Sequence, residues 1–356
     1  MAKKKKKNRS FRSRSNAPAK NASAQQTATV KKDVPKPKSE GSSAQSKSQK
    51  GVLPVKWANW LFLIFTVLVI ALTVTPLRII PREWRSVLAY IPVVIMALVV
   101  FRKQGVKARD IGFKRSKPIS YLLTAGIAIA VYPFASLISS LVKMIIPTLF
   151  IRDDIEQALS VGHIVNAVAL VFLTAILEEF LIRGCMAGSY LSTGRYRATV
   201  LLTALVFGLV QMTATGFLDA FVLGVVAALI YVLTDSIWPC IFFQILRKGA
   251  TVTFTLLEPT LRENDSILKY LLARDLGDPL IEAGSIVAAA VGLVLMVIFI
   301  RRLAEVEKST HKLKACNAGG GGKERLATLP LIVGVIALAI MLIFTDYAAY
   351  RAAFGY

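Results

Sequence analysis

Histidine is almost missing from this chain. The 356 residues include only His163 and His311. Histidine is the side chain whose unperturbed pKa places its change of charge between about pH 5 and 8, which makes it the usual acid–base group near neutrality. A site with an imidazole base would therefore have to use one of these two residues.

Cysteine is also scarce, with Cys185, Cys240 and Cys316. Three thiols make no disulfide framework, and their positions lack the spacing of a metal site. We interpret them as small apolar residues of the interior. The sequence therefore predicts neither a bound metal ion nor a cofactor.

Acidic residues are outnumbered by basic ones, 21 against 44, which gives a net charge of +23. Residues 1–56 hold sixteen Lys and Arg but only Asp33 and Glu40, a net charge of 16 − 2 = +14. Large apolar residues are rare before residue 51, so this segment cannot bury enough surface to offset its conformational entropy. We predict that residues 1–56 form a disordered, polybasic cytoplasmic tail.

Two interpretations of this tail stay open. Its basic residues can lie against anionic lipid headgroups, each contributing ~1 kcal/mol near the surface, or the tail can be a solvated topological anchor. Aromatic residues are not interleaved with the basic ones, so we expect no nucleic-acid partner.

Long apolar runs dominate the rest of the chain. Hydrophobic residues make up 55% of the sequence and the mean hydropathy is +0.58, whereas a soluble domain is about 45–50% apolar even with glycine counted. The sequence predicts an all-α, polytopic helical bundle in the lipid bilayer, with about eight or nine transmembrane helices of ~20 residues each. The candidate spans are roughly 57–77, 84–101, 118–142, 162–183, 198–215, 217–234, 237–257, 280–300 and 327–345.

Loop charges predict the orientation of the bundle, because cytoplasmic loops carry the excess of Lys and Arg. The tail and the basic loops 102–117 and 301–326 are predicted inside, and the acidic loops 152–161 and 258–279 outside. Three arginines follow the first span and would favour the opposite orientation, namely Arg78, Arg82 and Arg85. The larger basic segments carry more positive charge, so we let them decide the prediction. We expect a multi-pass protein with a cytoplasmic N-terminus.

Two adjacent glutamates, Glu178 and Glu179, fall inside the predicted span 162–183. A carboxylate in hydrocarbon costs at least ~2.5–3.5 kcal/mol on insertion scales, so such residues mark functional centres by default. Glu179 and Arg183 are four residues apart on one helical face and can pair, while Glu178 points about 100° away. An ion pair that only pins the helix at the inner interface would not need the second carboxylate.

Polar residues also interrupt two later spans. Gln211 falls late in one span and Gln244 inside the span 237–257, and a single Gln in a membrane helix is most often a hydrogen-bonding link between helices. Arg247 and Lys248 are two cations about ten residues from either end of that same span. They need anionic partners or a water-filled cavity, and the two glutamates are the natural candidates.

Three motifs in register resemble those of one known family. Glu178-Glu179-x-x-x-Arg183-Gly184 is similar to the first motif of the CAAX protease and bacteriocin-processing (CPBP, or Abi) family of intramembrane proteases. Phe207-Gly208-Leu209-Val210-Gln211 occupies the second motif, Phe-x-x-x-His. The third, His-x-x-x-Asn after a Ser-Ile-Trp-Pro-like turn, corresponds to Ser236-Ile237-Trp238-Pro239 followed by Gln244-Ile245-Leu246-Arg247-Lys248.

The resemblance covers roughly residues 164–250 and predicts the organisation of the chain. We expect N-terminal transmembrane helices over 57–160 and a CPBP-like core over 161–257. C-terminal transmembrane helices with a Gly-rich cytoplasmic loop follow over 258–356. The family is most abundant in bacteria, so the resemblance implies a bacterial plasma membrane.

The resemblance also assigns roles, with Glu178 as the would-be base. Its motif positions here are Glu178, Glu179, Arg183, Gln211, Gln244 and Lys248. Glutamine takes no proton near neutral pH, although it can still donate a hydrogen bond to an oxyanion. A cation such as Lys248 close to Glu178 favours the charged carboxylate and makes it a weaker base. Neither His163, at the outer end of its span, nor His311, in a loop, can substitute.

We favour a catalytically degenerate member that serves as a membrane scaffold or binding protein, similar to relatives that resemble lysostaphin resistance protein A. The alternative is an active glutamate-type endopeptidase that cleaves peptide or protein substrates within the membrane. Losing general-base help costs ~10²–10⁴-fold, which leaves room for weak activity. A carrier of small ligands or ions is a third interpretation, against which the lack of an inverted repeat counts.

Overall fold

The computed structural model describes residues 53–75, 82–145, 164–263, 279–318 and 325–354. Contacts divide the chain into two units, 1–47 and 48–356, and all described residues lie in the second. The regular structure of these described ranges is entirely helical. The predicted all-α fold class is therefore confirmed. Residues 1–52 of the predicted tail lie outside the described residues, whereas its predicted end at residue 56 is wrong, because α1 begins at Val55 and Leu53 and Val55 are buried in the bundle.

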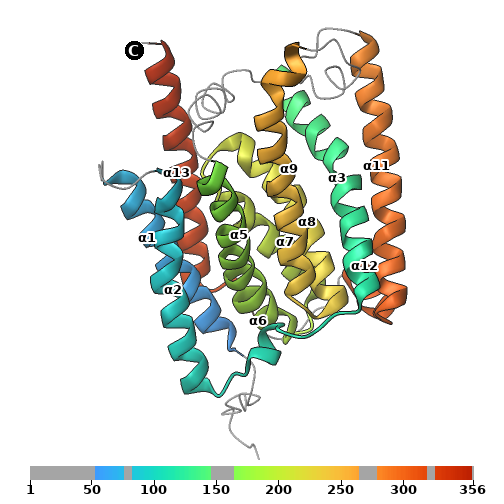
Figure 1. Ribbon diagram of the computed structural model, residues 1–356. Helices are drawn as coiled ribbons and strands as arrows, with labels where there is room; N and C mark the ends of the chain where they lie inside the picture. Colours follow the sequence, from blue (N-terminus) through green and yellow to red (C-terminus); the bar gives the residue numbers. More distant parts are fainter. Residues whose placement is uncertain (1–52, 76–81, 146–163, 264–278, 319–324, 355–356) are drawn as a thin grey trace, which may run out of the picture. The chain divides into compact units, whose positions relative to one another are not determined.

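Each predicted span coincides with a helix (Figure 1). The long helices are α1 Val55–Val74, α2 Arg82–Gln104, α3 Pro118–Ile145, α5 Ile164–Glu179, α7 Tyr196–Leu209, α8 Ala214–Thr234, α9 Trp238–Glu263, α11 Pro279–Val306 and α13 Leu329–Phe354. Shorter elements are the 3₁₀ turn η1 Ala108–Ile111, the π-helix Phe180–Ala187, α6 Gly188–Leu191 and α12 Thr310–Ala318. The predicted loop 301–326 is thus partly helical.

Among the described residues, six helices are long and apolar enough to cross a membrane: α1, α2, α3, α8, α11 and α13. The other three predicted spans are helices that fall outside this criterion for separate reasons. Helix α5 changes to π geometry after 16 residues, α7 has only 14 residues, and α9 carries charges in its middle. These three helices and the segments that directly follow α5 and α7 hold the motif residues, so the departures from a regular apolar span coincide with the predicted core.

The motif helices are enclosed by their neighbours. Helix α5 packs on α9 and α2, α7 packs along α8, and α1 packs on both α2 and α13 (Figure 1). Over half of the apolar window of α8 is buried, 56%, against 22% for α11 and for α13. Helix α8 is therefore a central helix, whereas α11 and α13 expose apolar side chains that suit contact with lipid.

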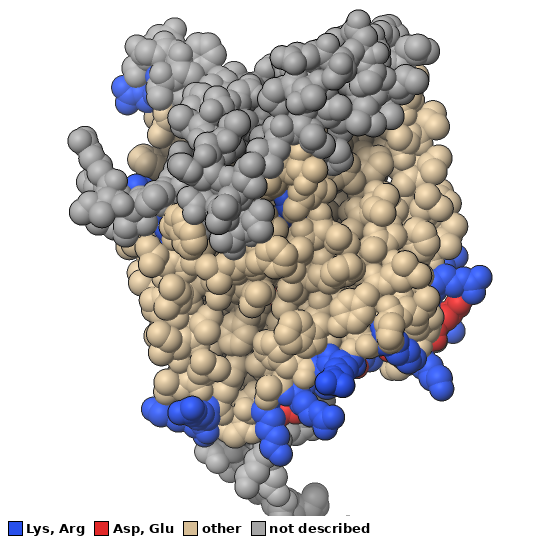
Figure 2. Space-filling model, in the orientation of Figure 1, with Lys and Arg blue, Asp and Glu red and all other residues tan. Residues whose placement is uncertain are grey.

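Two loops that were predicted on the same side of the membrane lie together. Lys117 Nζ is 3.8 Å from the Glu307 carboxylate, and the Ser120 hydroxyl donates to the same carboxylate at 2.5 Å. These contacts join the start of α3 to the end of α11. Figure 2 shows lysine and arginine side chains gathered along the lower edge of this face.

Small residues let the helices approach closely, as is common in membrane bundles. A Cβ at Gly292 of α11 would collide with the backbone carbonyl oxygen of Ala130 on α3. Nothing lies within 4 Å of the corresponding position at Gly284 on the same helix. The α3–α11 contact therefore requires glycine at position 292 but not at position 284.

We predict that Gly292→Ala destabilises the protein by about 1–3 kcal/mol, because the methyl group pushes two backbones apart. Gly284→Ala is the matched control and should be neutral or stabilise by up to about 1 kcal/mol, since alanine is the better helix former. Thermal unfolding in detergent measures both variants. Equal stability of the two would contradict the close contact.

Candidate functional site

The backbone changes geometry directly after the two glutamates. Glu179 is the last residue of α5, and the π-helix Phe180–Ala187, hereafter the π segment, continues the same rod into α6. Single-turn π geometry inside an α-helix is rare and is frequent at functional sites. All eight residues of the π segment are buried, as are Glu178 and Glu179.

Arg183 of the π segment joins three helices. Its Nη1 donates to Glu179 Oε1 at 2.9 Å, which confirms the predicted pair, and its Nη2 donates to the Gly224 carbonyl of α8 at 3.1 Å. Its guanidinium carbon lies 4.7 Å above the ring of Phe207 on α7, a cation–π contact. The first-motif arginine and the second-motif phenylalanine therefore touch directly.

Gly224 makes this arrangement possible. A Cβ there would lie 2.9 Å from Ala204 Cα and 3.2 Å from the ring of Phe207. The absence of a side chain lets α7 and α8 approach and leaves the Gly224 carbonyl open to the arginine. Sequence reasoning did not find this acceptor, since no pattern of residue types reveals a backbone carbonyl.

Gln244 of α9 belongs to the same cluster. Its Nε2 donates to Glu179 Oε1 at 3.1 Å, and its Oε1 accepts from Arg247 Nε at 3.2 Å. The third-motif position is thus brought to the first-motif carboxylate. The amide of Gln244 therefore links the carboxylate of Glu179 to a second cation, Arg247.

Glu178 pairs with Lys248, as the sequence indicated. Lys248 Nζ lies 2.8 Å from Glu178 Oε2 and also donates to Thr174 Oγ1 at 2.9 Å. The side chains are 17% and 9% exposed for Lys248 and Glu178, so the pair lies at the margin of the buried cluster. Thr174 was missed by sequence reasoning, although it stands one turn before Glu178.

Asp219 on α8 is a third carboxylate that sequence reasoning missed. The electrostatic field of Asp219 acts on Arg247 together with the fields of Glu178 and Glu179. The cluster then holds three anions and three cations, a formal sum of 3 − 3 = 0, namely Glu178, Glu179, Asp219, Arg183, Arg247 and Lys248. The sequence did contain a signal for this residue, because Asp219 is an acidic residue within the predicted apolar span 217–234.

Gln211 stands apart from this cluster. It lies half-buried in the turn after α7, and within the described residues no side-chain hydrogen bond joins it to either glutamate. Helix α13 holds the turn, since Thr345 Oγ1 donates to the Met212 carbonyl at 2.6 Å and the Ala214 amide donates to Asp346 at 2.9 Å. The structure therefore joins the first and third motif positions but leaves Gln211, the last residue of the second motif, in the turn after α7.

Several polar atoms around the cluster have no hydrogen-bond partner in the described structure. They are buried and include Glu179 Oε2, Arg183 Nε and the Tyr90 hydroxyl. Tyr90, on α2, lies within the electrostatic field of both glutamates. One acceptor and two donors are thus available for a polar group from elsewhere.

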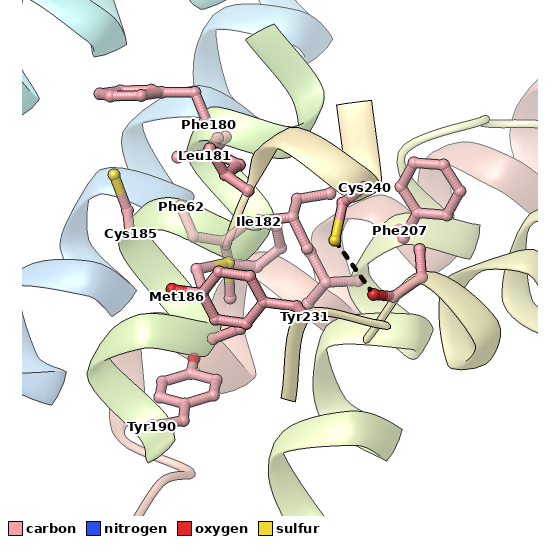
Figure 3. Close-up of a cluster of buried hydrophobic side chains, with 14 of the residues drawn as sticks. Phe62, Phe180, Leu181, Ile182, Cys185, Met186, Tyr190, Phe207, Tyr231 and Cys240 are labelled. Atoms are coloured by element: carbon pink, nitrogen blue, oxygen red, sulfur yellow. Dashed lines mark hydrogen bonds between the residues drawn. The ribbon is translucent and has the colours of Figure 1, made fainter. Parts of the chain in front are cut away.

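Apolar side chains surround the π segment on its other sides. Figure 3 shows Ile182 and Met186 among Phe62, Tyr231 and Cys240, whose thiol donates to the Ala227 carbonyl at 3.4 Å. All three cysteines are buried and free. Within the described ranges, no group of three or more His, Cys, Asp or Glu could hold a metal ion.

The two histidines do not join this cluster in the part of the chain that the structure describes. His311 is exposed on α12, and His163 lies outside the described residues. Chemically, the cluster offers a paired carboxylate in Glu178 and hydrogen-bond donors in Gln244 and Lys248.

We predict that Lys248→Ala destabilises the protein by up to about 3–5 kcal/mol, because it leaves the buried Glu178 carboxylate unpaired. Adding Glu178→Gln should restore much of the loss, which a double-mutant cycle in thermal unfolding measures. Lys312→Ala is a control that breaks a more exposed pair, 2.5 Å from Asp235, and should cost about 0–1 kcal/mol. Additive effects of the two core changes would show that the pair does not couple.

A scan against protein-family models matches residues 160–248 to the Rce1-like family, described as type II CAAX prenyl endopeptidase Rce1-like. The matched segment spans α5, the π segment, α7, α8 and the first part of α9. No curated protein and no solved structure matches the chain. The match therefore supports a relationship of this chain to the CAAX-protease-like family through residues 160–248, the segment that holds most of the charged cluster.

Proposed function

We propose that this protein is a catalytically degenerate member of the CAAX-protease-like family that acts as a membrane scaffold or binding protein. The observation that carries the proposal is the 2.8 Å pair between Glu178 and Lys248. The glutamate at the position of the family's base is held by a cation, which occupies Oε2, one of the two oxygens with which this carboxylate would hold a water molecule.

The other motif positions support the same conclusion. Gln244 stands where the family has a histidine and is engaged at both ends of its amide, with Glu179 and Arg247. Glutamine neither accepts nor releases a proton near neutral pH. The site therefore keeps a polar, hydrogen-bonded side chain at this motif position but lacks the histidine that could exchange a proton.

Binding is favoured by the polar atoms that the bundle leaves without partners. Glu179 Oε2 can accept a hydrogen bond, and Tyr90 and Arg183 can donate. Buried polar groups without partners each cost about 1–3 kcal/mol, so a polar group of a peptide or of a membrane-protein partner would gain by meeting them. We therefore assign Glu178, Glu179, Arg183, Gln244 and Lys248 to a binding site, with Gln211 at its margin.

The cellular setting is part of the proposal. The protein would be a multi-pass protein of the cell membrane, by default a bacterial plasma membrane, with its N-terminus in the cytoplasm. Its basic tail over residues 1–56 would lie against anionic lipid headgroups.

An active glutamate-type endopeptidase is the second candidate. It is favoured by the partial exposure of the Lys248 side chain, 17%, which leaves a route to the edge of the site. In that case Glu178 alone would activate water, and the amide of Gln244 and the ammonium of Lys248 would donate to the oxyanion.

Peptide cleavage distinguishes the two candidates. We predict that the protein, reconstituted in vesicles with candidate peptides, shows no difference between wild type and Glu178→Ala in product measured by mass spectrometry. Glu178→Gln is the matched control, because it keeps the side chain's size. Cleavage that both substitutions abolish would overturn the scaffold function and favour the endopeptidase.

Restoring the family's residues tests the degeneracy from the opposite direction. We expect Gln211→His/Gln244→His/Lys248→Asn to create cleavage that the wild type lacks, because it supplies imidazoles and frees Glu178. Adding Glu178→Ala to this triple variant should remove the activity. A triple variant that folds and remains inert would mean that more than these three positions separates this chain from active relatives.

A further inference from the structure

The connection between α2 and α3 carries an unusual excess of positive charge. Six basic residues lie within it and in the last turn of α2, all exposed: Arg102, Lys103, Lys107, Arg109, Lys114 and Arg115. None of the six forms an ion pair within the described part of the chain. The one acid among them, Asp110, accepts from the Lys107 backbone amide at 2.9 Å.

Three cations close to the connection do have acidic partners. Lys312 lies 2.5 Å from Asp235, and Arg302 lies 2.9 Å from Glu305. Lys117, at the end of the connection, faces Glu307 at 3.8 Å. The six residues, which lie close together in the sequence and form no ion pair in the described part of the chain, are hereafter called the basic platform. The connection that carries most of them runs along the lower end of the bundle in Figure 1.

The backbone of the platform is fixed to the core rather than left as a free loop. The Ile237 amide donates to the Gly112 carbonyl at 2.9 Å, and the Ser236 hydroxyl donates to the Lys114 carbonyl at 2.6 Å. Gly112 adopts φ +93°, where a Cβ would lie 2.7 Å from the Tyr231 ring. These contacts fix the backbone beside Lys114 and Arg115 before any partner binds, which reduces the ordering cost of binding.

Aromatic side chains place the platform at the depth of the headgroups. The ring of Phe113 packs edge-on against Trp238 with centroids 5.7 Å apart, and Trp238 is 44% exposed. Tryptophan at the surface of a membrane bundle is enriched at the level of the headgroups. A cluster of four to eight basic residues next to a membrane helix attracts anionic lipids.

We propose that the basic platform is a binding site for anionic lipid headgroups. The phosphates of phosphatidylglycerol or a similar lipid would contact the platform from the same leaflet, beside the turn that leads into α9. This site uses other residues than the N-terminal tail does and does not depend on whether the core cleaves peptides.

The test uses the full-length protein in detergent, titrated with phosphatidylglycerol or with phosphatidylcholine of the same chain length. Binding to the folded state raises the unfolding temperature by mass action. We expect Lys107→Gln/Arg109→Gln/Lys114→Gln/Arg115→Gln to weaken phosphatidylglycerol binding at least about tenfold. Phosphatidylcholine should stabilise the wild type and the variant equally.

A matched control removes four other exposed basic residues from the same end of the bundle, as Arg301→Gln/Lys308→Gln/Lys314→Gln/Arg325→Gln. It should weaken binding less than about threefold, as should a variant with Lys3 to Lys7 changed to Gln. Equal losses of phosphatidylglycerol affinity in the platform and control variants would show that the lipid responds to the general positive charge of this end of the bundle. That result would overturn the proposed binding site. An undiminished affinity of the platform variant would also overturn it. If the quadruple platform variant fails to fold, the two double variants at 107/109 and 114/115 carry the same comparison.

Discussion

The structure depends on the neutralisation of buried charge in the middle of a membrane bundle. Glu179 is fully buried and is held by Arg183 at 2.9 Å and by Gln244 at 3.1 Å. Because an unpaired ion in hydrocarbon is so costly, α5, α8 and α9 must meet at this point. The π segment, Gly224 and the close approach of α7 and α8 all help to bring these helices together at this point.

The same requirement limits the chemistry of the site. In a charge-balanced cluster each carboxylate has a cation beside it, and Glu178 has Lys248. A base must instead be able to take up a proton when substrate is bound. Under the proposed function, the pairing that stabilises the bundle takes the place of general-base catalysis, and hydrogen-bonding capacity is left at Glu179, Arg183 and Tyr90.

Much of this could be predicted from sequence because charge in an apolar run is a strong signal. The helices, the Glu179–Arg183 pair and the Glu178–Lys248 pair all follow from helical spacing and the cost of unpaired ions. Three features could not be predicted: the role of the Gly224 carbonyl, the π geometry and the position of Tyr90 near the two glutamates. They depend on how helices from distant parts of the chain pack. Asp219 was overlooked because it stands near the end of its helix, where an acid is common.

The central claim is that Glu178 is held by Lys248 at the centre of the bundle. Solid-state NMR of the isotope-labelled protein in vesicles measures this contact directly, with Glu178→Gln and Lys248→Ala identifying the signals of the two side chains. The account predicts a through-space correlation between the Lys248 side-chain nitrogen and the Glu178 carboxylate carbon, because the nitrogen lies 2.8 Å from Glu178 Oε2. A wild-type protein that shows both signals but no correlation between them would contradict the account.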